Sequence, residues 1–213
     1  MSTLPRFEAD MLPRSLVVDP PMTDAELEAF CLRNDVVQVE RTSKGVIVMN
    51  PPTGGETSRA NSEISARLFN WWSEHERGIV TDSSGGFYLP DRSMMSPDAA
   101  YISPETQKHI TKERRGGFFP VCPDFVIELL SKSDTLAQTQ DKMERWIANG
   151  AKLGWLIDPY RKQVLIYRPG VEPSIFTGKT LKGRAPVSGF NLDLVRIWRY
   201  YEEQVLGAAL PRL

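Results

Sequence analysis

Short apolar runs typical of strands alternate along this chain with segments in which apolar residues recur at helical spacing. The runs that predict strands lie at 36–40, 46–49, 79–81, 87–89, 99–102, 124–130, 153–157 and 164–167, with weaker signals around 175 and 181. The segments that predict helices lie at about 23–33, 57–76, 135–148 and 192–201. This alternation predicts an α/β protein, with an α+β mixed sheet flanked by helices.

Local signals sharpen several of these elements. Thr23 and Glu26 have the spacing of a capping box, which begins the first helix. A Ser-Lys-Gly turn at 43–45 joins the first two strands as a hairpin. In the longest helix, Ala60, Ile64 and Leu68 form one apolar stripe, so that helix is expected to bury a single face. The polar residues 104–119 predict a short helix followed by a loop.

The first part of the chain differs from the rest in proline content and in hydrophobic periodicity. Residues 1–22 contain four prolines and show no clear period, so 1–21 are expected to form an extended N-terminal arm. The remainder has no internal repeat and no low-complexity tract. Residues 22–213 are therefore predicted to form one domain, in which the first helix and the hairpin are an N-terminal elaboration.

Composition excludes several classes of protein. No window reaches about 18 uninterrupted apolar residues, so a membrane span is not expected. The N-terminus has no secretory pattern, and a cytoplasmic location is expected. Two cysteines and two histidines are too few for a disulfide framework or for a metal site rich in Cys or His.

Charge is close to balanced overall but uneven along the chain. The net charge of −1 argues against a surface devoted as a whole to nucleic acid. Residues 161–184, however, carry six basic side chains against one acidic side chain. Two interpretations stay open for this segment, a local basic face and a solvated sheet edge that carries Lys and Arg.

A carboxylate interrupts the most apolar strand. Residues 124–130 read Asp-Phe-Val-Ile-Glu-Leu-Leu, a run typical of a strand covered on both faces. Burial of an isolated charge is costly, so Glu128 is expected to be paired, to bind a cation or to lie at an open end of the sheet. A functional interpretation requires a second carboxylate within reach.

Asp98 and Asp124, each preceded by proline, are the candidates for that second carboxylate. Asp124 lies four residues before Glu128 on one strand, which separates the two Cα atoms by about 13 Å, too far for one ion. Asp98 begins a different strand, which can lie beside Glu128 at a spacing of about 4.8 Å. Asp98 is therefore preferred, and Asp124 is expected to cap the preceding turn. Two carboxylates on neighbouring strands suit Mg²⁺ or Mn²⁺.

A lysine beside such an ion would complete a site that cleaves phosphodiester bonds, because it can orient water and stabilise developing charge. The expected place is two residues after Glu128, but that residue is Leu130. Lys132 lies beyond the strand. Lys142 flanks the inner face of the following helix, where periodicity alone favours a surface lysine.

The ordered string of motifs resembles the Uma-two family of the PD-(D/E)XK nuclease superfamily. The resemblance runs from about Met22 to Trp198. The segments that carry it are 41–45 (Arg-Thr-Ser-Lys-Gly), 49–54, 82–87, 96–100 (Ser-Pro-Asp-Ala-Ala), 122–129, Lys142-Met143 and 154–159 (Gly-Trp-Leu-Ile-Asp-Pro).

The resemblance implies a restriction-endonuclease-like core and a set of site residues. Asp98 and Glu128 would bind the metal, with the backbone carbonyl of Leu129 as a further ligand. Lys142 would replace the strand lysine. Glu63 would be the acid that the family core adds from its first long helix and would bind metal or water, although its spacing alone also fits a solvated residue beside the apolar stripe. Gln140, near the middle of the apolar face of its helix, would support the site or contact the backbone.

The function implied is a Mg²⁺-dependent endonuclease that hydrolyses phosphodiester bonds in DNA. Two alternatives stay open. Leu130 and the near-neutral charge favour a catalytically inactive nuclease-fold module that binds DNA or protein, and Glu128 could instead form a buried salt bridge. A homodimer would supply two sites for cutting two strands, but no interface can be identified from the sequence.

Overall fold

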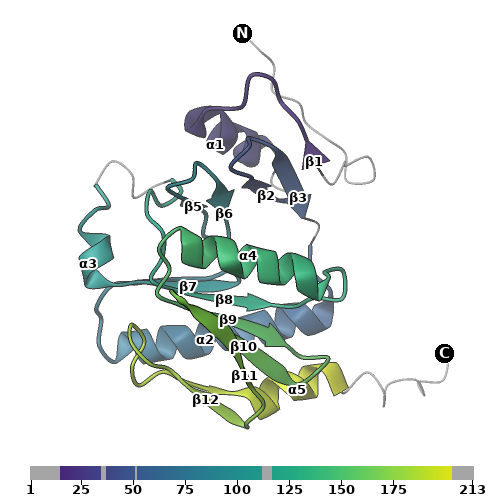
Figure 1. The fold of residues 1–213 in the computed structure, drawn as a ribbon, viewed down its shortest axis with the longest axis vertical. Helices are drawn as coiled ribbons and strands as arrows, with labels where there is room; N and C mark the ends of the chain where they lie inside the picture. Colours follow the sequence, from purple (N-terminus) through teal and green to yellow (C-terminus); the bar gives the residue numbers. More distant parts are fainter. Residues whose placement is uncertain (1–14, 35–36, 51, 112–116, 203–213) are drawn as a thin grey trace, which may run out of the picture.

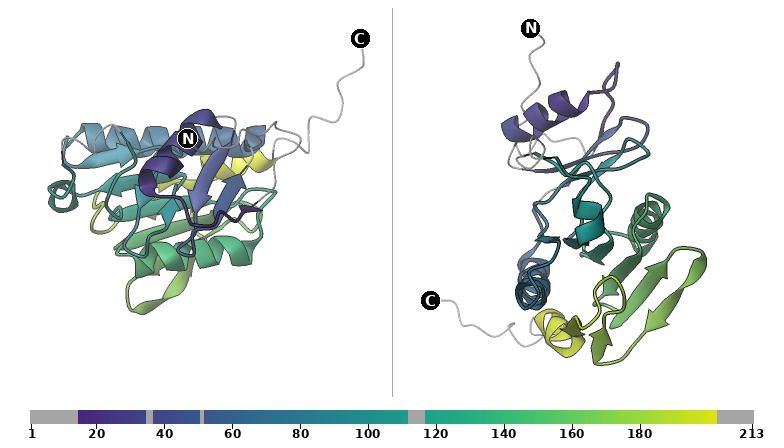
Figure 2. Two further views of the ribbon diagram at one scale, coloured as in Figure 1. Left: turned by 90° about the horizontal axis from the view of Figure 1, so that it is seen from above. Right: turned by 90° about the vertical axis from the view of Figure 1, so that its left-hand side faces the viewer.

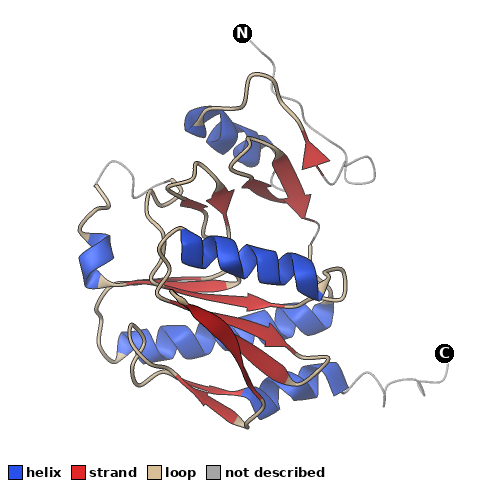
Figure 3. Ribbon diagram, in the orientation of Figure 1, coloured by secondary structure: helices blue, strands red, loops and turns tan. Residues whose placement is uncertain are grey.

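The structure is a computed structural model that describes residues 15–34, 37–50, 52–111 and 117–202. A six-stranded sheet occupies the lower part of the molecule, and a smaller sheet with its own helix lies above it (Figure 1). Helices lie on both sides of the larger sheet (Figure 3). No helix within the described ranges is both long enough and apolar enough to cross a membrane.

The larger sheet has the strand order β11-β10-β9-β8-β7-β4. Its strands are β4 (Ile79–Thr81), β7 (Ala99–Ile102), β8 (Phe125–Leu129), β9 (Leu153–Asp158), β10 (Gln163–Arg168) and β11 (Val171–Phe176). The β8–β9 pair is parallel, because helix α4 (Leu136–Ala148) returns the chain between them. The other neighbouring pairs are antiparallel.

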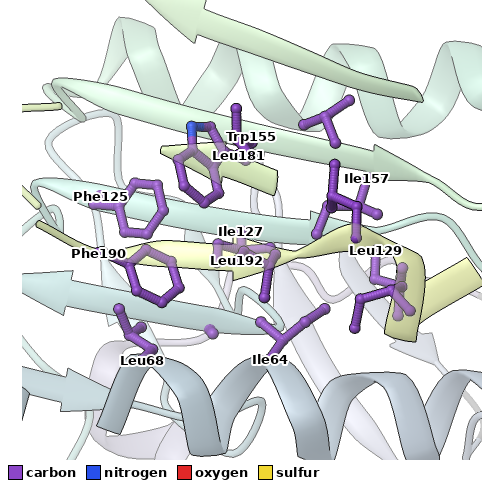
Figure 4. Packing of buried hydrophobic residues seen from close by; sticks show 14 of the residues in the cluster. Ile64, Leu68, Phe125, Ile127, Leu129, Trp155, Ile157, Leu181, Phe190 and Leu192 are labelled. Atoms are coloured by element: carbon purple, nitrogen blue, oxygen red, sulfur yellow. The ribbon is translucent and has the colours of Figure 1, made fainter. Parts of the chain in front are cut away.

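Two helical layers cover this sheet. Helices α2 (Gly55–Ser73) and α5 (Leu194–Glu202) pack against one face, and α4 packs against the other (Figure 2). Phe125 and Ile127 of β8 lie in the same apolar cluster as Ile64 of α2 (Figure 4). Val126 and Leu130 lie in the cluster beneath α4. Strand β8 is therefore covered on both faces, and alternation places Glu128 on the α4 face.

The smaller sheet has the order β1-β3-β2-β6-β5 and packs against helix α1 (Asp24–Arg33). Its strands are β1 (Ser15–Leu16), β2 (Gln38–Arg41), β3 (Ile47–Asn50), β5 (Phe87–Tyr88) and β6 (Met94–Met95). Strands β2 and β3 form the predicted hairpin, in which Gly45 adopts a φ of +81°. A two-stranded sheet of β12 (Thr180–Lys182) and β13 (Asn191–Asp193) precedes α5.

Two expectations differ from the structure. Strand β1 pairs with β3, so the end of the predicted N-terminal arm belongs to the smaller sheet; residues 1–14 lie outside the described ranges. Strand β6 was not predicted, since two methionines between turns are too short a signal. The excursion predicted at 104–119 begins with a short helix, as expected: helix α3 is Pro104–Gln107, and 112–116 lie outside the described residues.

Candidate active site

Strands β7 and β8 bring two acidic residues to one end of the larger sheet. The strands are antiparallel, with Ala99 opposite Ile127, so Asp98 at the start of β7 lies opposite Glu128 near the end of β8. The backbone N–H of Asp98 donates to the Ile127 carbonyl at 3.1 Å, which extends the pairing to Asp98. Both residues lie where the sequence predicted neighbouring strands to place them.

Glu128 is almost completely buried, with 4% of its surface exposed. Trp146 of α4 donates its indole N–H to Oε1 at 2.7 Å, and the Lys142 ammonium contacts the same oxygen at 3.1 Å. Both contacts use Oε1, and neither uses Oε2. Burial raises the pKa of Glu128 to about 8; Asp98 and Glu40 add to this shift, and Lys142 opposes it.

Lys142 is held by protein groups on three sides. Its Nζ contacts Oε1 of Glu128, Oε1 of Glu40 at 2.9 Å and the Ser96 carbonyl at 2.8 Å, which matches the three donors of an ammonium group. Burial favours the neutral amine, but the surrounding carboxylates outweigh it and raise the pKa of Lys142. Lys142 is thus a charged, largely enclosed residue, and the surface position that periodicity favoured is wrong.

The Asp98 carboxylate lies immediately before the first residue of β7, beside the end of β8. Its Oδ2 accepts a hydrogen bond from the Leu129 backbone N–H at 2.7 Å, and its Oδ1 accepts one from the Asn61 side chain at 2.7 Å. The Asp98 carboxylate is therefore held by the backbone of β8, the strand that carries Glu128, and by helix α2. Burial raises the pKa of Asp98, against the opposing effect of Leu129, Lys142 and Asn61.

Two residues near these acids were not predicted from the sequence. Glu40 comes from β2 of the smaller sheet, and nothing in an ordinary alternating strand distinguishes it. Asn61 lies on α2 three residues before Ile64. Its position beside the buried stripe was the one feature of the sequence that could have indicated a role in the site. Glu40, Asp98, Glu128 and Lys142 are called the Lys142 cluster below.

The two supporting residues implied by the resemblance lie elsewhere. Glu63 pairs with Arg67 at 2.8 Å and with Arg196 at 3.0 Å, and none of its contacts in the described chain is to the Lys142 cluster. On the same helix it is Asn61 that contacts Asp98. Gln140 lies beside the Tyr167 hydroxyl of β10.

Asp124 lies at the opposite end of β8. It accepts a hydrogen bond from the Ser103 backbone N–H at 2.7 Å and pairs with Lys152 at 2.6 Å. Burial favours its neutral form, but the bonds from Lys152 and Ser103 lower the pKa of Asp124. Asp124 therefore stabilises the segment that begins α3, rather than capping the turn before β8 as the sequence suggested.

The charges of the Lys142 cluster suit a divalent cation. Three carboxylates and one ammonium carry an excess of two negative charges when all are ionised, and they lie in a largely buried environment. Within the described ranges, no three His, Cys, Asp or Glu side chains form a complete metal-binding group. Mg²⁺ commonly needs only one or two carboxylates, with water and phosphate oxygens completing its shell. The side chain that binds Asp98 also presents a buried oxygen without a hydrogen bond, Asn61 Oδ1.

Comparison with known proteins identifies a family and a structure of similar fold. A family model named Uma2, described as "Putative restriction endonuclease", matches residues 24–195. The crystal structure of a nuclease, described as putative and as belonging to DUF820, from Anabaena variabilis has a similar fold, with a TM-score of 0.63 and 20% sequence identity. The likeness covers 76% of this chain and 90% of that chain. No curated protein matches.

Proposed function

The chain belongs to the Uma2 family, a nuclease family, and we propose that it hydrolyses phosphodiester bonds in DNA with the help of Mg²⁺ or Mn²⁺. The observation that carries this proposal is the contact of Lys142 with buried Glu128, beside Asp98 at the end of two neighbouring strands. Such an arrangement would offer a divalent cation two carboxylate ligands beside an ammonium group.

Asp98 and Glu128 are the side chains that would hold the cation, and the backbone carbonyl of Leu129 is a third oxygen in the proposed site. A bound divalent cation acts as a Lewis acid on a phosphate oxygen and lowers the pKa of coordinated water. Trp146 fixes the Glu128 carboxylate, and Asn61 with the Leu129 N–H fixes the Asp98 carboxylate. Both ligands are therefore oriented by neighbours before any cation binds.

Lys142 would act directly on the reacting groups. When Glu128 binds the cation, the ammonium donor that Glu128 accepts would be released to the attacking water, and the ammonium charge would stabilise the negative charge that develops on the phosphate. The enclosed position keeps this charge in a region where its electrostatic effect is stronger than in bulk water. Glu63 has no part in this proposal, because its contacts are with Arg67 and Arg196.

Part of the basic segment that could face DNA is already paired. Arg161 contacts Asp158 at 3.1 Å, and Lys162 contacts Glu202. The Lys162–Glu202 pair is exposed, and such pairs are weak, with a median of about 0–1 kcal/mol, so Lys162 remains available to phosphates at low cost. Arg161 is instead paired with the fully buried carboxylate of Asp158. We propose DNA as the substrate and a homodimer as the assembly that would cut both of its strands.

The proposal is tested with a labelled DNA duplex and a supercoiled plasmid, in Mg²⁺ or Mn²⁺ and in EDTA. Asp98→Asn, Glu128→Gln and Lys142→Met should each lower cleavage by about a hundredfold or more. Glu172→Gln, a change of an exposed carboxylate on β11, should leave cleavage unchanged. A wild-type protein that cuts neither substrate in either metal would overturn the proposal.

The catalytically inactive module has one observation in its favour. Every donor of the Lys142 ammonium is already bonded within the protein, as in a structural salt bridge. Calorimetric titration with Mn²⁺ separates the two functions. Binding that is lost in Asp98→Asn and in Glu128→Gln supports the nuclease, whereas no binding by the wild-type protein supports the inactive module.

A further inference from the structure

Strand β2 carries one side chain out of the smaller sheet and into the candidate site. Val39 and Arg41 are buried, and Val39 packs in the apolar cluster of α1. Alternation directs Glu40 to the opposite face of the strand, where it meets Lys142 of α4. The hairpin above α4 in Figure 1 is therefore connected directly to the site below it.

Glu40, Ser96 and Lys142 form a closed set of three interactions. Oε1 of Glu40 accepts a hydrogen bond from the Ser96 backbone N–H at 2.9 Å and contacts Nζ of Lys142 at 2.9 Å. The Ser96 carbonyl accepts a hydrogen bond from the same Nζ at 2.8 Å. The set joins three segments distant in sequence: β2, the approach to Asp98, and α4.

The neighbouring residue fixes the position of β2. The Arg41 guanidinium donates to the carbonyls of Arg92 and Met22, at 3.1 and 3.0 Å, and pairs with Asp24 at 2.7 Å. It also lies over the ring of Tyr88. Because Arg41 is buried and held on several sides, Glu40 projects from a rigid support, which is what precise placement of an active-site group requires.

We infer that Glu40 is a positioning residue that holds the Lys142 ammonium in the site, and that the N-terminal hairpin thereby completes the active site. This inference rests on the proposed function. Glu128, the other carboxylate on Lys142, is also a proposed metal ligand, and its orientation must satisfy the cation. Glu40 and the Ser96 carbonyl are two anchors outside the proposed ligands, so Lys142 stays in place whatever Glu128 binds.

The first test compares Glu40→Ala with the wild-type protein on a labelled DNA duplex. Without Glu40 the Lys142 ammonium is held less precisely. This should lower kcat by about tenfold to a hundredfold and leave KM within about threefold of the wild-type value. Glu40→Gln keeps a neutral acceptor for Ser96 and Lys142, so its kcat should lie between the kcat of Glu40→Ala and that of the wild-type protein. Gln38→Ala is the matched control: it lies on the same face of β2 and bonds the Ser83 carbonyl at 2.8 Å, away from Lys142. An unchanged kcat in Glu40→Ala would overturn the inference.

The second test uses Mn²⁺ calorimetry and needs no activity. A positioning residue should leave the Kd for Mn²⁺ within about threefold in Glu40→Ala, because the proposed ligands remain. A Kd weakened by more than about thirtyfold would make Glu40 a ligand itself and would also overturn the inference.

The third test is a double-mutant cycle of Glu40→Ala and Lys142→Met, followed by urea unfolding in EDTA. The two shifts in the unfolding midpoint should be non-additive, because the residues are in contact. Additive shifts would show that the hairpin does not hold Lys142. If the wild-type protein cleaves no DNA, the proposed function fails, but this cycle still shows whether Glu40 and Lys142 interact.

Discussion

The charge of Glu128 should destabilise the metal-free protein more as pH rises, and Glu128→Gln should remove that effect. The substitution keeps the shape of the side chain and an oxygen that can accept the Trp146 indole N–H. Burial raises the pKa of Glu128 from 4.5 to about 8 in the folded protein. Between these values the folded state binds a proton that the unfolded chain has released. The stability that protonated Glu128 contributes is therefore fully present below about pH 4.5, and it is lost as pH rises to about 8.

The size of the effect follows from this pKa shift. Each pH unit inside the window changes the free energy of unfolding by about 1.4 kcal/mol. From pH 6 to pH 8, the wild-type protein should lose about 2 kcal/mol relative to Glu128→Gln, after allowance for partial ionisation near pH 8. The difference between the two proteins reports Glu128 together with its coupling to Lys142, Asp98 and Glu40, since titrating groups away from this cluster contribute equally to both.

The assay is urea unfolding in EDTA at pH 6, 7 and 8. Glu172→Gln, with its exposed carboxylate, should differ from the wild-type protein by an amount that does not change with pH. Added Mn²⁺ should raise the unfolding midpoint of the wild-type protein but not that of Glu128→Gln, because a ligand stabilises only the state that binds it. A wild-type protein that gains stability relative to Glu128→Gln as pH rises would refute the reasoning. It would show that the Lys142 pair keeps Glu128 ionised, as in a structural salt bridge.

Three further substitutions test the surroundings of the site. Asn61→Ala removes the hydrogen bond to Asp98 and should weaken Mn²⁺ binding by about tenfold in calorimetry; an unchanged Kd would contradict this role. Trp146→Phe removes the donor to Glu128 and should lower the free energy of unfolding in urea at pH 8 by about 1–3 kcal/mol, whereas equal stability would contradict a structural role for that bond. Leu130→Lys puts the motif lysine where only 4% of the residue is exposed, so it should lower stability by several kcal/mol and not increase cleavage; a stable, more active variant would contradict this.

Local patterns sufficed for the parts of the fold that depend on neighbours in sequence. The apolar run around Glu128 indicated a strand covered on both faces, and in the structure this strand lies between two apolar clusters, one on each face of the sheet. The Ser-Lys-Gly turn indicated the β2–β3 hairpin, where Gly45 takes a positive φ. Strand spacing indicated that Asp98, not Asp124, lies opposite Glu128. The first two predictions used a periodicity or a turn that is complete within a short segment, and the third used the distance between residues along and across strands.

The rest of the site depends on contacts between distant segments, which no local pattern contains. Glu40 meets Lys142 only because the smaller sheet packs above α4, and 102 positions separate the two residues in the numbering. Asn61, rather than Glu63, meets Asp98 because the rotation of α2 is set by its buried stripe. That stripe was visible in the sequence, but the polar residue adjoining it was not assigned to the site.

The fold offers a physical reason for the position of the proposed catalytic lysine, Lys142, on the helix and not on the strand. Leu130 and Glu128 share one face of β8, and that face lies under α4, where Leu130 packs with Met143 and Trp146. A lysine at position 130 would have to bury its charge in this apolar layer. Lys142 and Trp146 are four residues apart on α4, so both project from one side of the helix, and both reach the same oxygen of Glu128. The helix thus supplies the ammonium together with the hydrogen bond that orients the carboxylate. An incomplete strand motif does not by itself indicate an inactive site, provided that the following helix carries a lysine within reach of the glutamate.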